Sequence, residues 1–304
     1  MATVPNPYAE QLARVPATEQ TVRVLGSDTR YWEYGAPADG PTLVLVHGFR
    51  GDHHGLEPVV AFLPGVHIVS PDLPGFGAST PLAEERHDIG GYGRWLAAFV
   101  AGIGAERVVL VGHSFGSIVV AGAVAAGLAA DRVVLINPVA APALSGPRGV
   151  LTRLAVFYYW LAAALPERLG FALLRNRVVV RVMSLAMVKT RRPALRRFVH
   201  DQHDRYFSAF ADRRVVLEAF RASVGEDVSE FAARVGRPTL LVAADRDDIT
   251  PVLAEVRLQR LFPAASLKII AGVGHLIHYE KPREAAAHIA RFLGIPGPGI
   301  GGAQ

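Results

Sequence analysis

Residues 107–127 read RVVLVGHSFGSIVVAGAVAAG, and this stretch decides the fold. It begins with a short apolar run typical of a buried strand and ends with small residues that suit a helix. Between the two stands Gly112-His113-Ser114-Phe115-Gly116, a G-x-S-x-G pattern. In a strand–turn–helix context this pattern predicts a tight turn that lifts a serine hydroxyl out of the sheet. The sequence therefore predicts Ser114 as a nucleophile.

The two outer glycines of this pattern have a steric reason. The turn strains the serine backbone, and side chains two residues away on either side would collide, so glycine is needed there. The N-terminus of the following helix also offers backbone N–H groups to a developing anion. The alternative interpretation is a glycine-rich turn with an incidental serine.

Outward from this turn, short β-branched runs alternate with helical stretches. The alternation predicts an α/β fold with a mostly parallel central sheet flanked by helices, and the first two runs suggest an antiparallel start. The expected strands are Thr21–Leu25, Arg30–Tyr34, Thr42–Val46, His67–Ser70, Arg107–Val111, Arg132–Ile136, Thr239–Ala244 and Ser266–Ile270. The expected helices are Leu56–Leu63, Asp88–Ile103, Phe115–Gly127, Val252–Leu261 and Pro282–Leu293.

The alternation stops after Asn137-Pro138. Residues 141–232 are rich in alanine, leucine, arginine and aromatic residues, which predicts an inserted helical cap, or lid, domain. Residues 1–140 and 233–304 would then form the core domain.

A serine nucleophile needs a base, and the second half of the chain supplies one. Gly272-Val273-Gly274-His275 follows the expected strand 266–270 and places His275 on a flexible loop. The rival is His278, but Glu280-Lys281-Pro282 resembles a helix start, so we expect His278 to pack or cap there.

The acid that orients the base has three candidates. Asp245, Asp247 and Asp248 all lie on the loop after strand 239–244, and local chemistry does not choose among them. The other position for an acid, at the end of strand 132–136, holds Asn137. Because an amide cannot stabilise an imidazolium as a carboxylate does, the acid is expected on the later loop.

The first half of the chain supplies a candidate oxyanion hole. His47-Gly48-Phe49 ends strand 42–46, and Gly48 lets the backbone approach closely. We expect the N–H groups of Phe49 and Phe115 to be the donors. His47 is interpreted as a brace for this loop rather than as a second base.

These residues together resemble the α/β-hydrolase superfamily, in the serine-nucleophile branch with a helical cap. The resemblance covers residues 21–293 except the cap. It rests on His47-Gly48-Phe49, Asp72-Leu73-Pro74-Gly75-Phe76-Gly77-Ala78-Ser79, Gly112–Gly116, Asp247 with Pro251, and Gly274-His275. The family's acid usually stands four residues before a proline, which implies Asp247. Ala244 and Asp248 depart from the family pattern, and Asp245 stays the alternative.

The resemblance implies acyl chemistry. Epoxide hydrolases and haloalkane dehalogenases of this fold carry aspartate where this chain has Ser114. We therefore expect a serine hydrolase that cleaves an ester-type bond through an acyl-enzyme, and the apolar aromatic run Leu154–Leu165 favours a lipophilic or aromatic substrate. The alternatives are a C–C bond hydrolase, an acyltransferase or a cofactor-free haloperoxidase-like enzyme on the same triad. A further alternative is a ligand-binding or membrane-surface protein on a hydrolase scaffold.

Composition limits the other classes of function. The chain has no cysteine, which excludes disulfides and thiolate chemistry. Residues 1–20 lack a secretory signal pattern and no long apolar run appears, so we expect a soluble, cytoplasmic protein whose association with a membrane, if any, is peripheral. No nucleotide-binding pattern is seen, and we expect no cofactor, metal or nucleic acid. His200 with His203 and the pair His53-His54 are interpreted as solvent-facing.

The net charge of +5 is a local property. Residues 145–200 hold eleven basic residues and one acidic residue, Glu167. Within them, Leu154–Leu165 is apolar almost all round and is expected to pack over Ser114, with Phe157 and Trp160 joining Gly48 and His113 around the substrate. Apolar and basic residues side by side also suggest peripheral contact with an anionic membrane.

Overall fold

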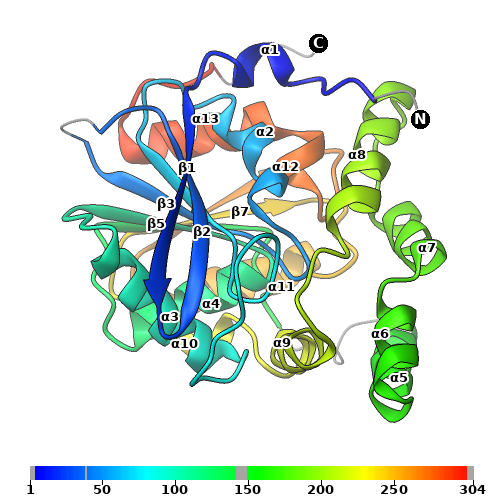
Figure 1. The fold of residues 1–304 in the computed structure, drawn as a ribbon. Helices are drawn as coiled ribbons and strands as arrows, with labels where there is room; N and C mark the ends of the chain where they lie inside the picture. Colours follow the sequence, from blue (N-terminus) through cyan, green and yellow to red (C-terminus); the bar gives the residue numbers. More distant parts are fainter. Residues whose placement is uncertain (1–3, 38–39, 142–148, 300–304) are drawn as a thin grey trace.

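A mixed eight-stranded sheet forms the centre of the protein (Figure 1). A computed structural model describes residues 4–37, 40–141 and 149–299. Within these residues the strand order is β1-β2-β4-β3-β5-β6-β7-β8. The strands are β1 (Ala17–Val24), β2 (Ser27–Tyr34), β3 (Thr42–Val46), β4 (Ile68–Pro71), β5 (Val108–His113), β6 (Arg132–Ile136), β7 (Thr239–Ala244) and β8 (Ala265–Ile270).

The sheet starts antiparallel and continues parallel. β1 pairs with β2, and β2 with β4, in antiparallel fashion, whereas the neighbours from β4 to β8 run parallel. This confirms the predicted fold class and the antiparallel start. β1 begins at Ala17 rather than at Thr21, because its first five residues are exposed and pair with β2 through the backbone. An exposed edge strand of this kind has no apolar alternation, so the sequence pattern does not indicate where the strand begins.

Helices cover both faces of the sheet. Alternate residues of β5 face opposite sides: Val109 and Val111 pack in the apolar cluster of α2 and α13, and Val108 and Leu110 in that of α3, α4 and α11. A parallel strand buried on both faces reads as one apolar run, as β5 does. These helices are α2 (Glu57–Val60), α3 (Ile89–Gly102), α4 (Phe115–Ala125), α11 (Val252–Leu261) and α13 (Pro282–Leu293).

Between β6 and β7 the described chain is helical, and we call residues 149–232 the helical insert. Figure 1 shows α5 to α8 along one side of the molecule. The insert consists of α5 (Gly149–Ala164), α6 (Glu167–Leu174), α7 (Arg177–Met187), α8 (Pro193–Tyr206), α9 (Arg213–Gly225) and α10 (Ser229–Ala232). In the described ranges, no helix has both the length and the apolar character needed to cross a membrane.

Helix α5 was expected to pack over Ser114, and its described side chains are buried on one side only. Tyr159 and Ala162 are buried against the core, but Leu154, Phe157 and Trp160 are exposed. A single helix packed on one surface can bury only the stripe that faces that surface, and the composition of α5 does not reveal which stripe this is.

The N-terminal segment holds α8 against the core. The Tyr8 hydroxyl donates a hydrogen bond to the carbonyl oxygen of Tyr279 in α12 (Ile277–Glu280). The Tyr8 ring also makes edge contacts with Phe62 and with Phe198 of α8. The segment before β1 therefore joins α8 to the end of the core that follows β8.

Candidate active site

Ser114 occupies the turn between β5 and α4. Its backbone has φ +52° and ψ −119°, a conformation that residues other than glycine rarely adopt. A Cβ added to Gly112 would lie 2.4 Å from the carbonyl oxygen of Gly116, and a Cβ added to Gly116 would lie 2.2 Å from that of Val46. Both glycines are therefore required by neighbouring backbone, and the turn holds the serine side chain at a pocket.

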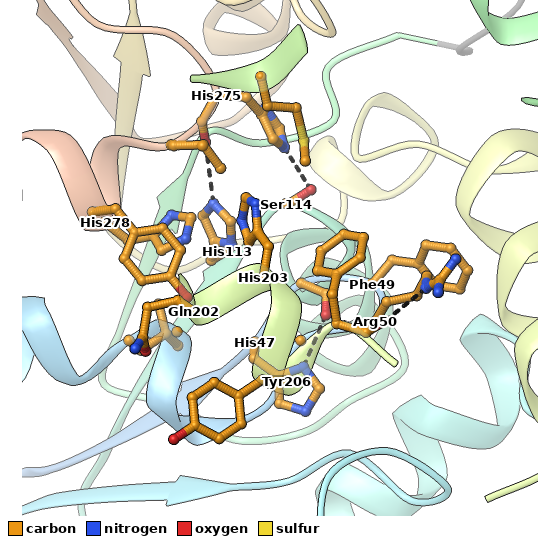
Figure 2. Close-up of a pocket in the computed structure, with 18 of the residues that line it drawn as sticks. His47, Phe49, Arg50, His113, Ser114, Gln202, His203, Tyr206, His275 and His278 are labelled. Carbon is orange, nitrogen blue, oxygen red and sulfur yellow. Dashed lines mark hydrogen bonds between the residues drawn. The ribbon is translucent and has the colours of Figure 1, made fainter. Parts of the chain in front are cut away.

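His275 lies beside Ser114, on the loop between β8 and α12 (Figure 2). Its Nε2 is 2.7 Å from Ser114 Oγ, and its Nδ1 is 2.8 Å from Asp247 Oδ2. A carboxylate only accepts hydrogen bonds, so Nδ1 carries the proton and Nε2 is free to accept one from the serine. The structure thus brings together three residues that lie far apart in the sequence.

Asp247 is held as an anion on the loop after β7. Its Oδ2 also accepts from Asn137 Nδ2 at 3.0 Å, and its Oδ1 accepts from the N–H groups of Ile249 at 2.8 Å and Thr250 at 3.3 Å. Burial acts to raise the pKa of Asp247, but the interactions with His275 and these N–H groups outweigh burial and lower the pKa. The carboxylate is therefore available to orient the imidazole and offset its charge.

The two neighbouring aspartates have other partners. Asp245 accepts from the N–H groups of Gly272 at 2.7 Å and Val273 at 3.3 Å, so it fixes the loop that leads to His275. Asp248 forms an ion pair with Lys189 of the helical insert. Of the three aspartates, Asp247 is the one whose carboxylate is hydrogen-bonded to His275.

Two further imidazoles line the pocket beside the site and are neutral. His113 and His278 are in ring contact, with centroids 4.1 Å apart. Burial lowers the pKa of His113 to about 3 and holds that of His278 well below its ordinary value. His278, the sequence rival for the base, packs in this pair, as expected from the helix start that follows it.

The turn after β3 lies against Ser114. A Cβ on Gly48 would be 3.1 Å from His113 Nδ1 and 3.2 Å from Ser114 Cβ, so a side chain here would press on both residues. His47 braces the turn: its Nε2 accepts from the Leu73 N–H at 2.8 Å and its Nδ1 donates to the Gly48 carbonyl at 2.8 Å. With both ring nitrogens engaged, His47 is not free to act as a base, and the bracing interpretation is confirmed.

Two backbone N–H groups were expected to bind the oxyanion. That of Phe49 belongs to the braced turn, and that of Phe115 is the first in α4, so it has no partner within the helix. That these two N–H groups form an oxyanion hole stays a prediction of the sequence.

A pocket of about 180 Å³ opens in front of Ser114. Most of its wall is apolar, with polar groups near α8 (Figure 2). Among the lining residues are Gly48, Phe49, Leu56, His113, Met183, Met187, Gln202, His203, Tyr206, Phe207, Ile249, Leu276, His278 and Tyr279.

Not all of the residues expected to contact the substrate lie at the pocket. Gly48 and His113 line the pocket, but Phe157 and Trp160 do not, and these two side chains are exposed by 56% and 60%. The expectation for Phe157 and Trp160 is corrected, because α5 turns that side of the helix away from the core. Met183 and Met187 of α7 line the pocket instead. Their spacing of one helical turn was the available sequence signal, and it does not distinguish a pocket from ordinary packing.

The pair His200 and His203 was wrongly expected to face solvent. Both are buried, and both Nδ1 atoms contact the Ser184 hydroxyl, at 2.6 Å and 2.7 Å. Burial lowers the pKa of His203 to about 3 and also lowers that of His200. These side chains join α7 to α8 and stay neutral.

His53 is also buried, against the solvent-facing expectation, and half-buried His54 lies next to it. Asp52, His53 and His54 have ligand atoms within 4.8 Å of one another, a geometry that could hold a metal ion. Each side chain nevertheless has a protein partner: His53 Nδ1 lies 2.9 Å from Asp72, and His54 Nδ1 lies 3.3 Å from Asp52. Hydrogen bonding thus accounts for the cluster.

Comparison with known proteins agrees with this geometry. Residues 43–288 match the model of the alpha/beta hydrolase family, and the chain belongs to that family. It is similar to the uncharacterized hydrolase YugF of Bacillus subtilis, with 24% identity over 86% of this chain and 93% of the relative. It is also similar to the monoacylglycerol lipase abhd6-B of Xenopus laevis, with 24% identity over 89% of this chain and 83% of the relative.

Among solved structures, a membrane phospholipase A described as a bacterial virulence factor superposes with a TM-score of 0.67. It has 25% identity and the match covers 93% of this chain and 87% of that one. The fold, the site and these relatives together make the protein an α/β-hydrolase enzyme.

Proposed function

We propose that the protein is a serine hydrolase that cleaves lipophilic or aromatic acyl esters through an acyl-enzyme at Ser114. The observation that carries the proposal is the continuous hydrogen-bonded chain Ser114–His275–Asp247 at the mouth of an apolar pocket. The lipase and phospholipase relatives support a lipophilic substrate.

Each step has a group to perform it. Ser114 Oγ attacks the ester carbonyl carbon while His275 Nε2 takes the hydroxyl proton, and the carbonyl oxygen becomes an anion between the N–H groups of Phe49 and Phe115. The C–O bond then breaks, and the imidazolium gives its proton to the leaving alkoxide, which departs as the alcohol. Water, deprotonated by His275, attacks the acyl-enzyme and releases the carboxylic acid and free Ser114.

A fluorophosphonate probe and an ester panel test this proposal. The probe should label the wild type and not Ser114→Ala, because it reacts with an activated serine. On p-nitrophenyl esters graded by chain length, medium-chain and aromatic acyl groups should exceed acetyl in kcat/KM. A preference for acetyl would exclude the lipophilic pocket, and turnover of a vinylogous diketone without ester turnover would favour the C–C hydrolase.

The outer side of the helical insert supports a second proposal, peripheral contact with an anionic membrane. Large apolar side chains there are half or more exposed, and exposed arginines stand among them. The apolar residues are Leu154, Phe157, Trp160, Leu169, Val178, Val182 and Leu185, and the arginines are Arg153, Arg168, Arg175 and Arg177. Each arginine close to an anionic lipid surface contributes about 1 kcal/mol.

Helix α7 connects this outer side to the pocket. Val178, Val182 and Leu185 lie on one stripe and are exposed, whereas Met183 and Met187 line the pocket. Contact with lipid through the first stripe would place the pocket wall at the surface where lipophilic esters concentrate.

Sedimentation with vesicles tests this contact. Binding to anionic but not neutral vesicles, lost at high salt, is the expected result, and the double variant Phe157→Ser/Trp160→Ser should abolish it. Leu253→Ser is the matched control, because Leu253 is equally exposed but belongs to α11. Equal loss in both variants, or salt-independent binding to neutral vesicles, would contradict the proposal.

A further inference from the structure

Arg50 is a fully buried arginine that follows the oxyanion turn directly. Its side chain leaves the core loop after β3 and enters the helical insert, beside Phe49 (Figure 2). Its Nε donates to the Phe207 carbonyl at 2.9 Å, its Nη1 to the Tyr159 hydroxyl at 3.1 Å and its Nη2 to the Leu174 carbonyl at 2.7 Å. One side chain of the core thus joins α5, the end of α6 and the segment after α8.

The acceptors of these bonds are neutral oxygens. Nη2 also lies 3.5 Å from the Ser208 hydroxyl, and the guanidinium stacks 5.2 Å from the ring centres of both Phe207 and Phe210. Burial raises the pKa of Tyr159 in spite of the opposing charge of Arg50, so this tyrosine is a neutral phenol. Among the described residues, the contacts of this buried cation are dipoles and aromatic faces, and an apolar residue would fill the same space at a lower desolvation cost.

The backbone around Arg50 is clamped from both sides. Arg50 itself has φ +61°, in the left-handed region that favours glycine, and the Gly51 N–H closes the turn on the Gly48 carbonyl at 3.0 Å. His47 fixes the start of this turn to the core, as described above. The Phe49 ring, between the two clamps, contacts Tyr159 of α5. A strained conformation of this kind persists only where its surroundings hold it.

We infer that Arg50 is a positioning residue, which ties the placement of the Phe49 N–H to the closed packing of the helical insert. The other oxyanion donor, the Phe115 N–H, is set by α4 in the core. The hole is therefore complete only when the insert binds the guanidinium. The inference rests on the proposed function, since it concerns the oxyanion of the reaction at Ser114.

The test compares Arg50→Met with Arg213→Met. Arg213 is a suitable control because its Nη1 donates to the carbonyls of Ala162, Ala163 and Leu165, all within the insert. On a short-chain p-nitrophenyl ester, Arg50→Met should lower kcat about 10- to 100-fold, which is no more than the loss expected from deleting one oxyanion donor. KM should change less than about 3-fold. Arg213→Met should keep kcat within about 2-fold.

A pair of inhibitors separates displacement of the oxyanion hole from general loosening. A trifluoromethyl ketone forms a hemiketal oxyanion with Ser114, whereas the matching long-chain alcohol only fills the pocket. In Arg50→Met the affinity for the ketone should fall by the same factor as kcat, and that for the alcohol should not change. Equal losses for both ligands, or a kcat within 2-fold of the wild type, would overturn the inference.

Two milder variants keep the test decisive if Arg50→Met fails to fold. Tyr159→Phe and Ser208→Ala each remove one acceptor from the insert and leave the guanidinium in place. Tyr159→Phe, which removes the shorter contact, should show the same split between the ketone and the alcohol at a few-fold scale, and no split in it would overturn the inference. Absence of fluorophosphonate labelling in the wild type would instead overturn the proposed function.

Discussion

The core and the helical insert hold their functional residues in different ways. In the core, Ser114, His275 and Asp247 follow strand ends and are hydrogen-bonded to one another, and the Ile249 N–H also binds Asp247. In the insert, Met183 and Met187 reach the pocket from a helix whose opposite side is exposed. The difference teaches that the chemistry is built into a rigid scaffold, whereas the shape of the pocket depends on how a few helices pack on it.

The largest effect is expected in the core. Ser114→Ala should lower kcat/KM on esters by about 1,000- to 1,000,000-fold, because it removes the nucleophile and the remaining groups catalyse little. The melting temperature should stay near that of the wild type, since the change removes one half-buried hydroxyl oxygen from a turn. Turnover at wild-type rates would place the nucleophile elsewhere.

Substitutions of the aspartates on the loop after β7 are expected to have the next largest effect on kcat. Asp247→Asn should lower kcat about 10,000-fold, because the amide neither holds the imidazole tautomer nor offsets its charge. Asp245→Asn is the control: its carboxylate bonds backbone N–H groups near His275, so a loss of at most about 10-fold is expected. Measuring the kinetics of both variants in parallel tests this assignment, and a larger loss of kcat in Asp245→Asn would identify Asp245 as the acid.

The two sides of the insert can be compared by paired truncations. Met187→Ala should widen the pocket and shift the preferred acyl chain to longer esters, with a change in the kcat/KM ratio of about 5- to 20-fold. Phe157→Ala, on the exposed side of α5, should leave the chain-length profile on soluble esters within about 2-fold. A shift in both variants would mean that α5 also reaches the substrate.

Two buried histidines, one in the core and one in the insert, are expected to make the protein less stable at acid pH. Burial lowers the pKa of His113 in the core and of His203 in the insert to about 3. Below about pH 6.5 these histidines bind a proton in the unfolded chain but stay neutral in the folded chain. Each of them therefore lowers the free energy of unfolding by about 1.4 kcal/mol per pH unit as the pH falls toward 3. Urea unfolding at pH 7.5, 6 and 5 measures this slope.

Replacing either histidine by asparagine should make the slope shallower by about that amount. If the insert and the core unfold together, the two variants change one transition equally. If the insert unfolds first, His203→Asn alone changes the first transition. A slope unchanged in both variants would contradict the assignment of neutral buried histidines.

The sequence predicted most of the fold because its signals are local. The G-x-S-x-G pattern, the apolar strand runs and the Gly-x-Gly-His loop each predict structure within a few residues. Asp247 could not be chosen by local chemistry, because the choice depends on Asn137 and His275, which approach it only in the fold.

The insert was predicted less well for the same reason. Helical composition shows that a helix exists but not which side meets the core, and this is why Phe157 and Trp160 were misplaced. Arg50 was missed because its partners lie more than 100 residues away. No pattern near Arg50 indicates that the side chain is buried.

The Tyr8–Tyr279 contact has a consequence for the way the chain folds as it is synthesised. Its two residues are 271 positions apart, and those of the Ser114–His275 contact are 161 apart. During synthesis Tyr8 and the serine turn leave the ribosome well before their partners, so neither contact can form until residues 275–279 have been made. Under the proposed function, Ser114 therefore stays without its base until synthesis has passed His275, and contacts of such long range favour slow assembly.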